Sequence, residues 1–184
     1  MCYIIVLLVT ISISGVFGFA QNSEDETLKQ IKRDSRVFEN IINEVLRENF
    51  DNPFAIAAEP RAAFLKGYGL TVTFQVKVNR GSIRGPWGEI DNPWTKQSTT
   101  KEDQISVIKK TMIQALADYG NTVKHLTRGD RITICAHIED LNELDKTKAR
   151  TVLLLSALRS NIQKYVTTQL TFDQFSETLE ILEY

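Results

Sequence analysis

The sequence predicts an α+β domain, with a mainly antiparallel sheet and helices packed on one face of that sheet. The clearest observation is the strict alternation of apolar and polar residues over 70–78, which is typical of a half-buried strand. Two amphipathic helical stretches, at 24–50 and 100–126, offer apolar faces that can cover such a sheet. The polar residues of the alternating strand indicate that part of the other sheet face meets solvent.

Composition and charge indicate one ordinary globular domain. The 184 residues are 42% hydrophobic and 24% charged, with 22 lysines and arginines against 23 aspartates and glutamates. Such a balance produces no strong field toward DNA or an anionic membrane, so nucleic-acid binding is not expected. The chain contains no internal repeat and no low-complexity tract.

The first twenty residues are set apart by their predominantly apolar composition. Small residues, Gly18 and Ala20, stand at −3 and −1 from a cleavage point before Gln21, and polar sequence follows at once. This layout is typical of a secretory signal peptide. We expect residues 1–20 to be removed, and residues 21–184 to form a single α+β domain that is exported, either periplasmic or secreted.

The missing basic residues ahead of the apolar stretch leave a retained membrane anchor as the alternative. Membrane contact is expected only through this segment if it stays uncleaved. Cys2 would be lost with it, so Cys135 is the single cysteine of the mature domain and no internal disulfide can form. Cys135 is then either buried and inert or reactive. The oligomeric state is left open.

The first helix is predicted over Glu24–Phe50. Ser23 is the expected N-cap, and the turn-forming residues 51–53 are expected to end the helix. Ser35 and Asn49 fall on the apolar seam, which favours packing across a sheet over a two-stranded coiled coil.

A hairpin is predicted next. Residues 54–60 are interpreted as a connector, and residues 62–66 as a strand that pairs with the alternating strand 70–78. Gly67 and Gly69 supply the positive φ that such a turn needs.

An irregular loop is predicted over residues 79–100, which are rich in glycine and proline. A loop of this length without its own structure is usually functional or disordered, and a tryptophan ring either packs down or awaits a partner. Trp87 and Trp94 therefore either fold back as a lid on the domain's own core or belong to a binding loop. On the second interpretation the binding residues are Arg84, Trp87 and Trp94, with Tyr68 from the hairpin turn.

The remainder alternates between helices and strands. Thr99 or Thr100 caps the second helix, whose apolar face includes Tyr119, and Gly120 ends or bends it. Two strands are predicted after it, at 131–139 and 151–156, and the second is apolar on both faces and so central or doubly covered. A short helix at 159–166, a helical turn at 171–174 capped by Thr171, and a closing strand at 178–183 complete the chain.

One strand carries the residues nearest to catalytic chemistry. Cys135 and His137 project to the same side of it and could form a thiolate–imidazole pair oriented by Glu139, alongside Arg131 and Thr133. Side chains two residues apart stand roughly 6.5–7 Å apart along a strand, too far for contact unless their rotamers lean together. No catalytic residue is assigned.

Metal and nucleotide sites are not expected. The two histidines, His125 and His137, share no ligand spacing, and the Asp-Asn pairs at 51–52 and 91–92 precede prolines and indicate turns. Residues 67–69 are not a nucleotide loop, because a strand follows them where a helix N-terminus would be needed for the phosphate. No cofactor is predicted.

Two resemblances can be stated on particular residues. A signal peptide followed by a strand led by Gly67-Tyr68-Gly69 resembles uncharacterised exported bacterial proteins, which implies a location but no activity. Residues 108–134, especially 126–134, are similar to the helix-to-strand passage of von Willebrand factor A-type domains. In that family the preceding strand ends in a metal-binding DxSxS motif, whereas Asn79-Arg80-Gly81-Ser82 here lacks the aspartate and the paired serines. This resemblance implies at most a related topology without the metal.

These observations favour a non-enzymatic exported domain that binds a protein, an envelope component or a small ligand. The tryptophan loop and the polar sheet face are its candidate contact surfaces. The alternative is a cysteine-dependent hydrolase or redox protein that uses Cys135 and His137.

Overall fold

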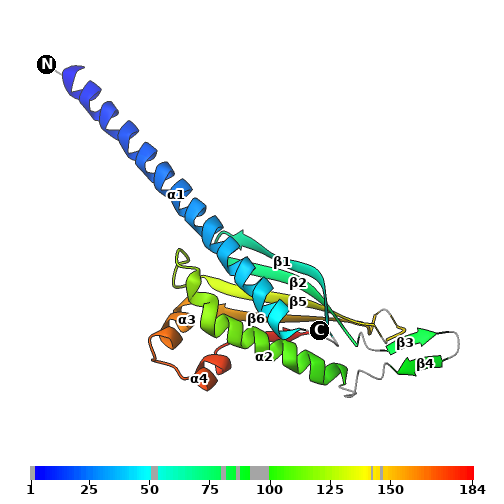
Figure 1. The fold of residues 1–184 in the computed structure, drawn as a ribbon. Helices are drawn as coiled ribbons and strands as arrows, with labels where there is room; N and C mark the ends of the chain where they lie inside the picture. The colour runs from blue at the N-terminus through cyan, green and yellow to red at the C-terminus, as the bar shows by residue number, and fades with distance from the viewer. Residues whose placement is uncertain are drawn as a thin grey trace.

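The computed structural model describes residues 3–50, 54–79, 82–85, 88–91, 100–141, 143–145 and 147–184, without the side chains of 3–24, 82–85 and 88–91. Five strands form one sheet in the order β1-β2-β5-β6-β7, with α1 and α2 against one of its faces (Figure 1). All neighbours in it are antiparallel except β2 and β5, which are parallel. The predicted α+β fold is therefore confirmed. The elements are α1 (Tyr3–Asn49), β1 (Ala55–Leu65), β2 (Gly69–Val78), β3 (Ser82–Gly85), β4 (Gly88–Asp91), α2 (Lys101–Tyr119), a 3-10 turn (Gly120–Thr122), β5 (Arg131–Asp140), β6 (Arg150–Leu158), α3 (Arg159–Val166), α4 (Phe172–Glu177) and β7 (Glu180–Glu183).

Helix α1 begins earlier than predicted. It is continuous from Tyr3, so Ser23 lies inside the helix and is not its N-cap. The reason is that backbone N–H groups near Ser23 find carbonyls in the preceding helical turn and need no capping side chain. The apolar stripe packs on the sheet, where Phe38 and Ile42 are fully buried. Ser35 on the seam is also buried and donates its hydroxyl to the Ile31 carbonyl at 2.7 Å. Packing across a sheet is thus confirmed, and residues 51–53 lie outside the description.

The predicted hairpin of β1 and β2 is present, but β1 is longer than expected. Residues 55–60 were interpreted as connector, whereas they pair with β2 through two register irregularities on either side of Ala58. Because β1 is an edge strand, it tolerates Pro60, which lacks a backbone donor. At the turn, Gly67 and Gly69 have φ of +82° and +130°, as predicted.

The segment between β2 and α2 is more regular than predicted. It contains its own antiparallel ladder, in which Ser82 to Gly85 of β3 pair with Asp91 to Gly88 of β4. The last pair of this ladder joins Gly85 and Gly88. Trp87 and Trp94 lie outside the described residues, so the choice between a lid and a binding loop stays a prediction.

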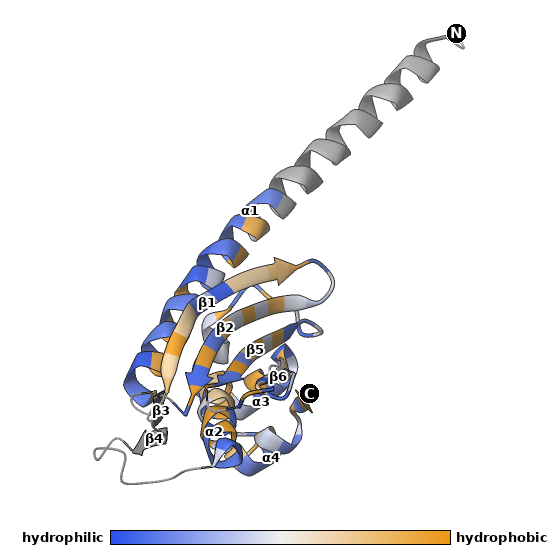
Figure 2. Ribbon diagram, turned by 90° about the vertical axis from the view of Figure 1, so that its right-hand side faces the viewer, coloured by the Kyte–Doolittle hydropathy of each residue, from blue (hydrophilic) through white to orange (hydrophobic). Residues whose placement is uncertain are grey.

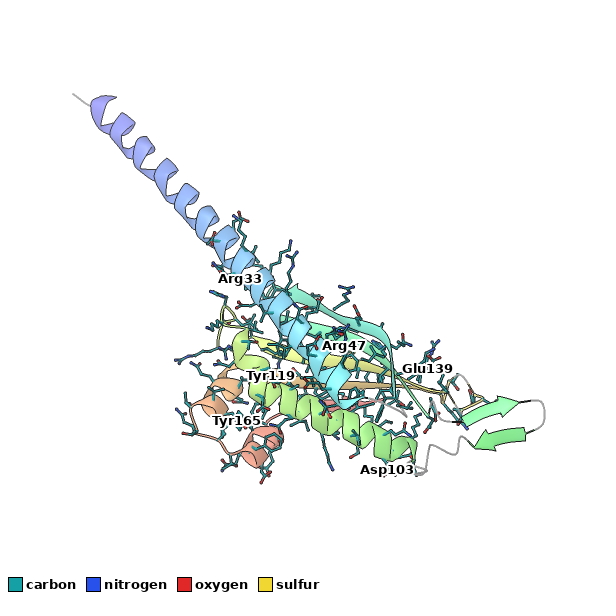
Figure 3. All side chains as sticks on the ribbon, in the orientation of Figure 1. Arg33, Arg47, Asp103, Tyr119, Glu139 and Tyr165 are labelled. Carbon is teal, nitrogen blue, oxygen red and sulfur yellow. The ribbon has the colours of Figure 1, made fainter. Side chains whose placement is uncertain are left out.

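Helix α2 begins as predicted, but it ends at Tyr119, before the predicted helical stretch reaches residue 126. Thr100 is its N-cap, in a capping box with Asp103, which Figure 3 labels. Asp103 N donates to Thr100 Oγ1 and Thr100 N donates to Asp103 Oδ2, both at 3.1 Å. Gly120 starts the 3-10 turn that follows the helix. Tyr119, expected on the apolar face, is instead 40% exposed, as the amphipathic side chain of tyrosine permits.

The C-terminal half confirms the remaining elements. Strand β6 is internal, between β5 and β7, and Thr171 caps α4 through a second capping box with Gln174. The closing strand begins at Glu180, two residues later than predicted. Tyr165 of α3 holds α4 through ring contacts with Phe175 at 5.2 Å between centroids, which brings fully buried Phe175 into the core.

A partly buried carboxylate connects α1 to the loop after α2. Asp34 Oδ2 accepts hydrogen bonds from Lys124 N at 2.7 Å, from His125 N at 3.2 Å and from His125 Nδ1 at 2.8 Å. Burial alone raises the pKa of Asp34, but the hydrogen bonds from His125 and Lys124 outweigh it, so the net pKa is lowered. This carboxylate is therefore bound in its ionised form.

Two glycines of the turn give a matched test of the fold. A Cβ at Gly69 would lie 2.0 Å from the Arg131 carbonyl oxygen, whereas one at Gly67 would meet nothing within 4 Å. We expect Gly67→Ala to lower the free energy of unfolding by about 1 kcal/mol through its positive φ alone. Gly69→Ala should cost more than about 3 kcal/mol, because β2 and β5 must separate. Urea unfolding measures both, and equal losses would contradict this account of the turn.

The hydrogen bonds of Asp34 to Lys124 and His125 predict a pH dependence of stability. Because the folded-state pKa of Asp34 is depressed, its contribution is present at neutral pH and lost as pH falls through that value. Asp34→Asn should cost about 1–2 kcal/mol at pH 7, and this cost should shrink as the pH falls below the ordinary aspartate pKa of about 3.9. Asp25→Asn is the control, because its ion pair with Lys29 is exposed and should contribute nothing measurable. If Asp34→Asn lowered the free energy of unfolding by the same amount from pH 7 to pH 3, the ionised Asp34 carboxylate would not be what stabilises this contact.

Candidate functional site

The sheet has one face that the helices leave uncovered, which we call the open sheet face. Its residues alternate with the core residues of each strand, as the hydropathy bands along β2 and β5 show (Figure 2). Strand pairing places them in rows across the sheet. The central row runs from Thr73 through Cys135 and Leu154 to Leu182, and the next runs from Gln75 through His137 to Val152.

A chain of hydrogen bonds crosses one end of this face. The hydroxyls of Tyr68 and Thr133 lie 2.8 Å apart, and Thr133 Oγ1 lies 3.0 Å from Ser156 Oγ. Arg131 Nη1 then donates to Ser156 Oγ at 3.4 Å and to Glu180 Oε2 at 2.8 Å. Since Thr133 and Ser156 are almost fully buried, the chain satisfies polar groups that would otherwise be costly. It holds Tyr68 over the sheet.

Cys135 and His137 approach each other more closely than their spacing predicts. Their side chains lean together, so that Cys135 Sγ lies 3.7 Å from His137 Nε2. The exception that the sequence prediction allowed, rotamers that lean together, therefore applies to this pair. Cys135 is partly buried, and this burial raises the pKa of its thiol. A raised pKa leaves a neutral thiol at pH 7, the opposite of an activated nucleophile.

Glu139 does not take the orienting role that the sequence predicted. Its Oε2 lies 3.7 Å from Lys77 Nζ and 3.5 Å from Gln75 Nε2, both on the neighbouring strand β2 (Figure 3 labels Glu139). The carboxylate is thus engaged across the strands, and His137 is exposed to solvent. The three residues do not form a relay of nucleophile, base and orienting acid.

The far end of β2 is anchored where the tryptophan-bearing segment begins. Asn79 has a positive φ of 58° and exchanges two hydrogen bonds with the buried side chain of Gln104, at 3.0 and 2.6 Å. Asn79 Nδ2 also donates to Asp140 Oδ1 at 2.9 Å. These contacts tie the start of the segment to α2 and to the end of β5.

The predicted binding residues fall in different parts of the chain. Tyr68 is exposed beside the open sheet face. Arg84 lies in β3, but its side chain is outside the description, as are Trp87 and Trp94. The structure therefore places one of the four. Sequence reasoning missed the hydrogen-bonded chain, since Ser156 and Glu180 join it through strand pairing that no local pattern reveals.

The described residues contain no metal centre, and no similar known protein indicates what the site does. Among the described residues, no three histidine, cysteine or carboxylate side chains gather so that they could hold a metal ion. Within the same residues, no helix has the length and apolar character needed to cross a membrane. Comparison of the chain with protein families, with curated proteins and with solved structures finds no match.

The state of Cys135 can be measured directly. Because burial raises its thiol pKa, we expect iodoacetamide at pH 7.5 to modify folded Cys135 about tenfold more slowly than the same residue in urea. Mass spectrometry of the peptide that contains Cys135 separates it from Cys2. His137→Ala should leave the rate within about twofold, because a neutral thiol gains little from the imidazole. Faster reaction in the folded chain, slowed by His137→Ala, would indicate an activated cysteine.

Proposed function

We propose that this protein is an exported, non-enzymatic binding domain that contacts a protein partner through its open sheet face. The observation that carries the proposal is the row from Thr73 to Leu182, which places apolar side chains beside polar ones on a face without helices. Leu182, the last residue of this row, is 48% exposed. Interfaces mix apolar anchors with satisfied polar groups in this way.

The shape of the surface favours a protein over a small ligand. Small-molecule sites are concave and enclose most of their ligand, whereas a sheet face is broad. The hydrogen-bonded chain from Tyr68 to Glu180 adds rigidity, since its buried hydroxyls are already paired. A rigid surface loses little conformational entropy on binding. Export is inferred from the apolar composition of residues 1–20 and the small residues before Gln21.

A second candidate is a cysteine-dependent hydrolase or redox protein. It is favoured by one observation, the 3.7 Å separation of Cys135 Sγ and His137 Nε2. Against it stand the raised pKa of Cys135 and the engagement of Glu139 with Lys77. The alkylation experiment above separates the two candidates.

Site-specific photocrosslinking in the cell that produces the protein tests the binding proposal. A photoreactive residue in place of Thr73 or Leu154 should yield the same partner adduct, and one in place of Lys110, on exposed α2 surface, should yield none. Purified protein without the photoreactive residue should compete for the partner and reduce the adduct. The Leu182→Asp variant should compete at least about tenfold less well, because a charge replaces an apolar anchor.

Leu144→Asp is the matched control for the competition. Leu144 is 81% exposed in the turn between β5 and β6, away from the paired rows of the sheet, so this variant should compete like the unchanged protein. Equal melting temperatures exclude misfolding in either variant. The proposal fails if the open-face positions yield no adduct, or if both aspartate variants compete equally.

A further inference from the structure

A groove between α1 and β1 is a second surface with a distinct character. This α1–β1 groove has a volume of about 450 Å³. Its apolar lining includes Leu28, Ile31 and Phe64, and its basic side chains are Lys32, Arg36 and Arg61. Leu28 is 49% exposed, although it is a large aliphatic side chain. The groove therefore combines uncovered apolar surface with cationic groups.

The positive charge of the groove is only partly compensated. Glu39 is its acidic lining residue, and one of its oxygens pairs with Arg61 at 3.4 Å while the other accepts from Ala62 N at 2.8 Å. Within the described residues, Lys32 and Arg36 have neither an ion-pair nor a hydrogen-bond partner. They are four residues apart on α1, where like charges are neighbours and repel. An anion seated between them would relieve that repulsion.

The Glu39 contact also shows that this groove is not a site for an added strand. The carboxylate caps the backbone N–H of Ala62 on the edge strand β1, and Pro60 two residues earlier has no N–H to offer. An extended peptide would need those donors. A ligand that offers apolar surface and negative charge therefore fits the groove better than a peptide that would add a strand through backbone hydrogen bonds.

We propose that the α1–β1 groove is a docking surface for an anionic phospholipid bilayer. Leu28, which is 49% exposed, would meet the acyl boundary, while Lys32 and Arg36 would meet lipid phosphates. The near-neutral net charge of the chain rules out long-range steering, but a local basic pair acts at contact distance.

The position of the groove along the chain fits this partner. The sequence is apolar up to Ala20, and Leu28 follows eight residues later in the continuous helix α1. Eight residues span roughly 12 Å of helix, so the groove would stay close to any bilayer that the apolar residues 1–20 enter while they remain attached. This inference is independent of the open sheet face.

Hydrogen exchange on the full chain tests the proposal. The chain is mixed with vesicles of phosphatidylcholine alone, or of phosphatidylcholine with phosphatidylglycerol, so that the apolar N-terminus is present in both. We expect amides of residues 28–36 and 61–66 to exchange at least about fivefold more slowly with the anionic vesicles, the factor for one basic contact. Lys32→Gln with Arg36→Gln should abolish this difference.

Lys110→Gln with Lys164→Gln is the control, because it makes the same charge change at exposed positions on α2 and α3. It should keep the protection. The proposal is overturned if both vesicle types protect equally, if neither protects, or if both double variants behave alike. Equal protection by soluble oleate without vesicles would also overturn it, since the ligand would then be a free fatty acid.

Discussion

The parallel pairing of β2 with β5 is the constraint on which the rest of this fold depends. It joins the N-terminal hairpin to the C-terminal strands, and its register sets Gly69 against Arg131. The backbones approach so closely there that a Cβ at Gly69 has no space. Arg131 N also donates to the Tyr68 carbonyl at 2.8 Å, so turn and strand begin together. A parallel pair requires a long crossover, and the segment that contains β3, β4 and α2 provides it.

That register also decides what stands on each face of the sheet. Leu70 to Val78 contribute their apolar residues to the core opposite Ile132, Ile134, Ala136 and Ile138, all of them buried. The intervening residues then fall in line on the open sheet face, with Cys135 at its centre. A shift by one residue would reverse both faces. The proposed partner surface and the core are therefore consequences of one alignment.

Helix α1 is held in place by two acidic residues with different surroundings. Asp34 binds the loop after α2, and Glu39 binds the edge of β1. Both carboxylates accept backbone N–H groups, so they fix the helix in place as well as neutralising cations. Lys32 and Arg36, on the same helix, have no such partner among the residues that the structure describes. This difference separates structural charges from those available to a ligand.

The sequence by itself determined the faces of the main strands and most of the elements, but not the β3–β4 ladder or the full lengths of α1 and β1. The alternation in β2 and β5, the capping residues Thr100 and Thr171, and the turn glycines were all legible, because each depends on neighbours within a few residues. Only the tertiary structure decided that β2 lies parallel to β5, that Ser156 and Glu180 complete the chain begun at Tyr68, and that Cys135 leans on His137. These features join residues brought together by strand register or rotamer choice, which hydrophobic periodicity does not encode. The α1–β1 groove belongs with them, since its basic and apolar groups come from two elements that meet only after folding.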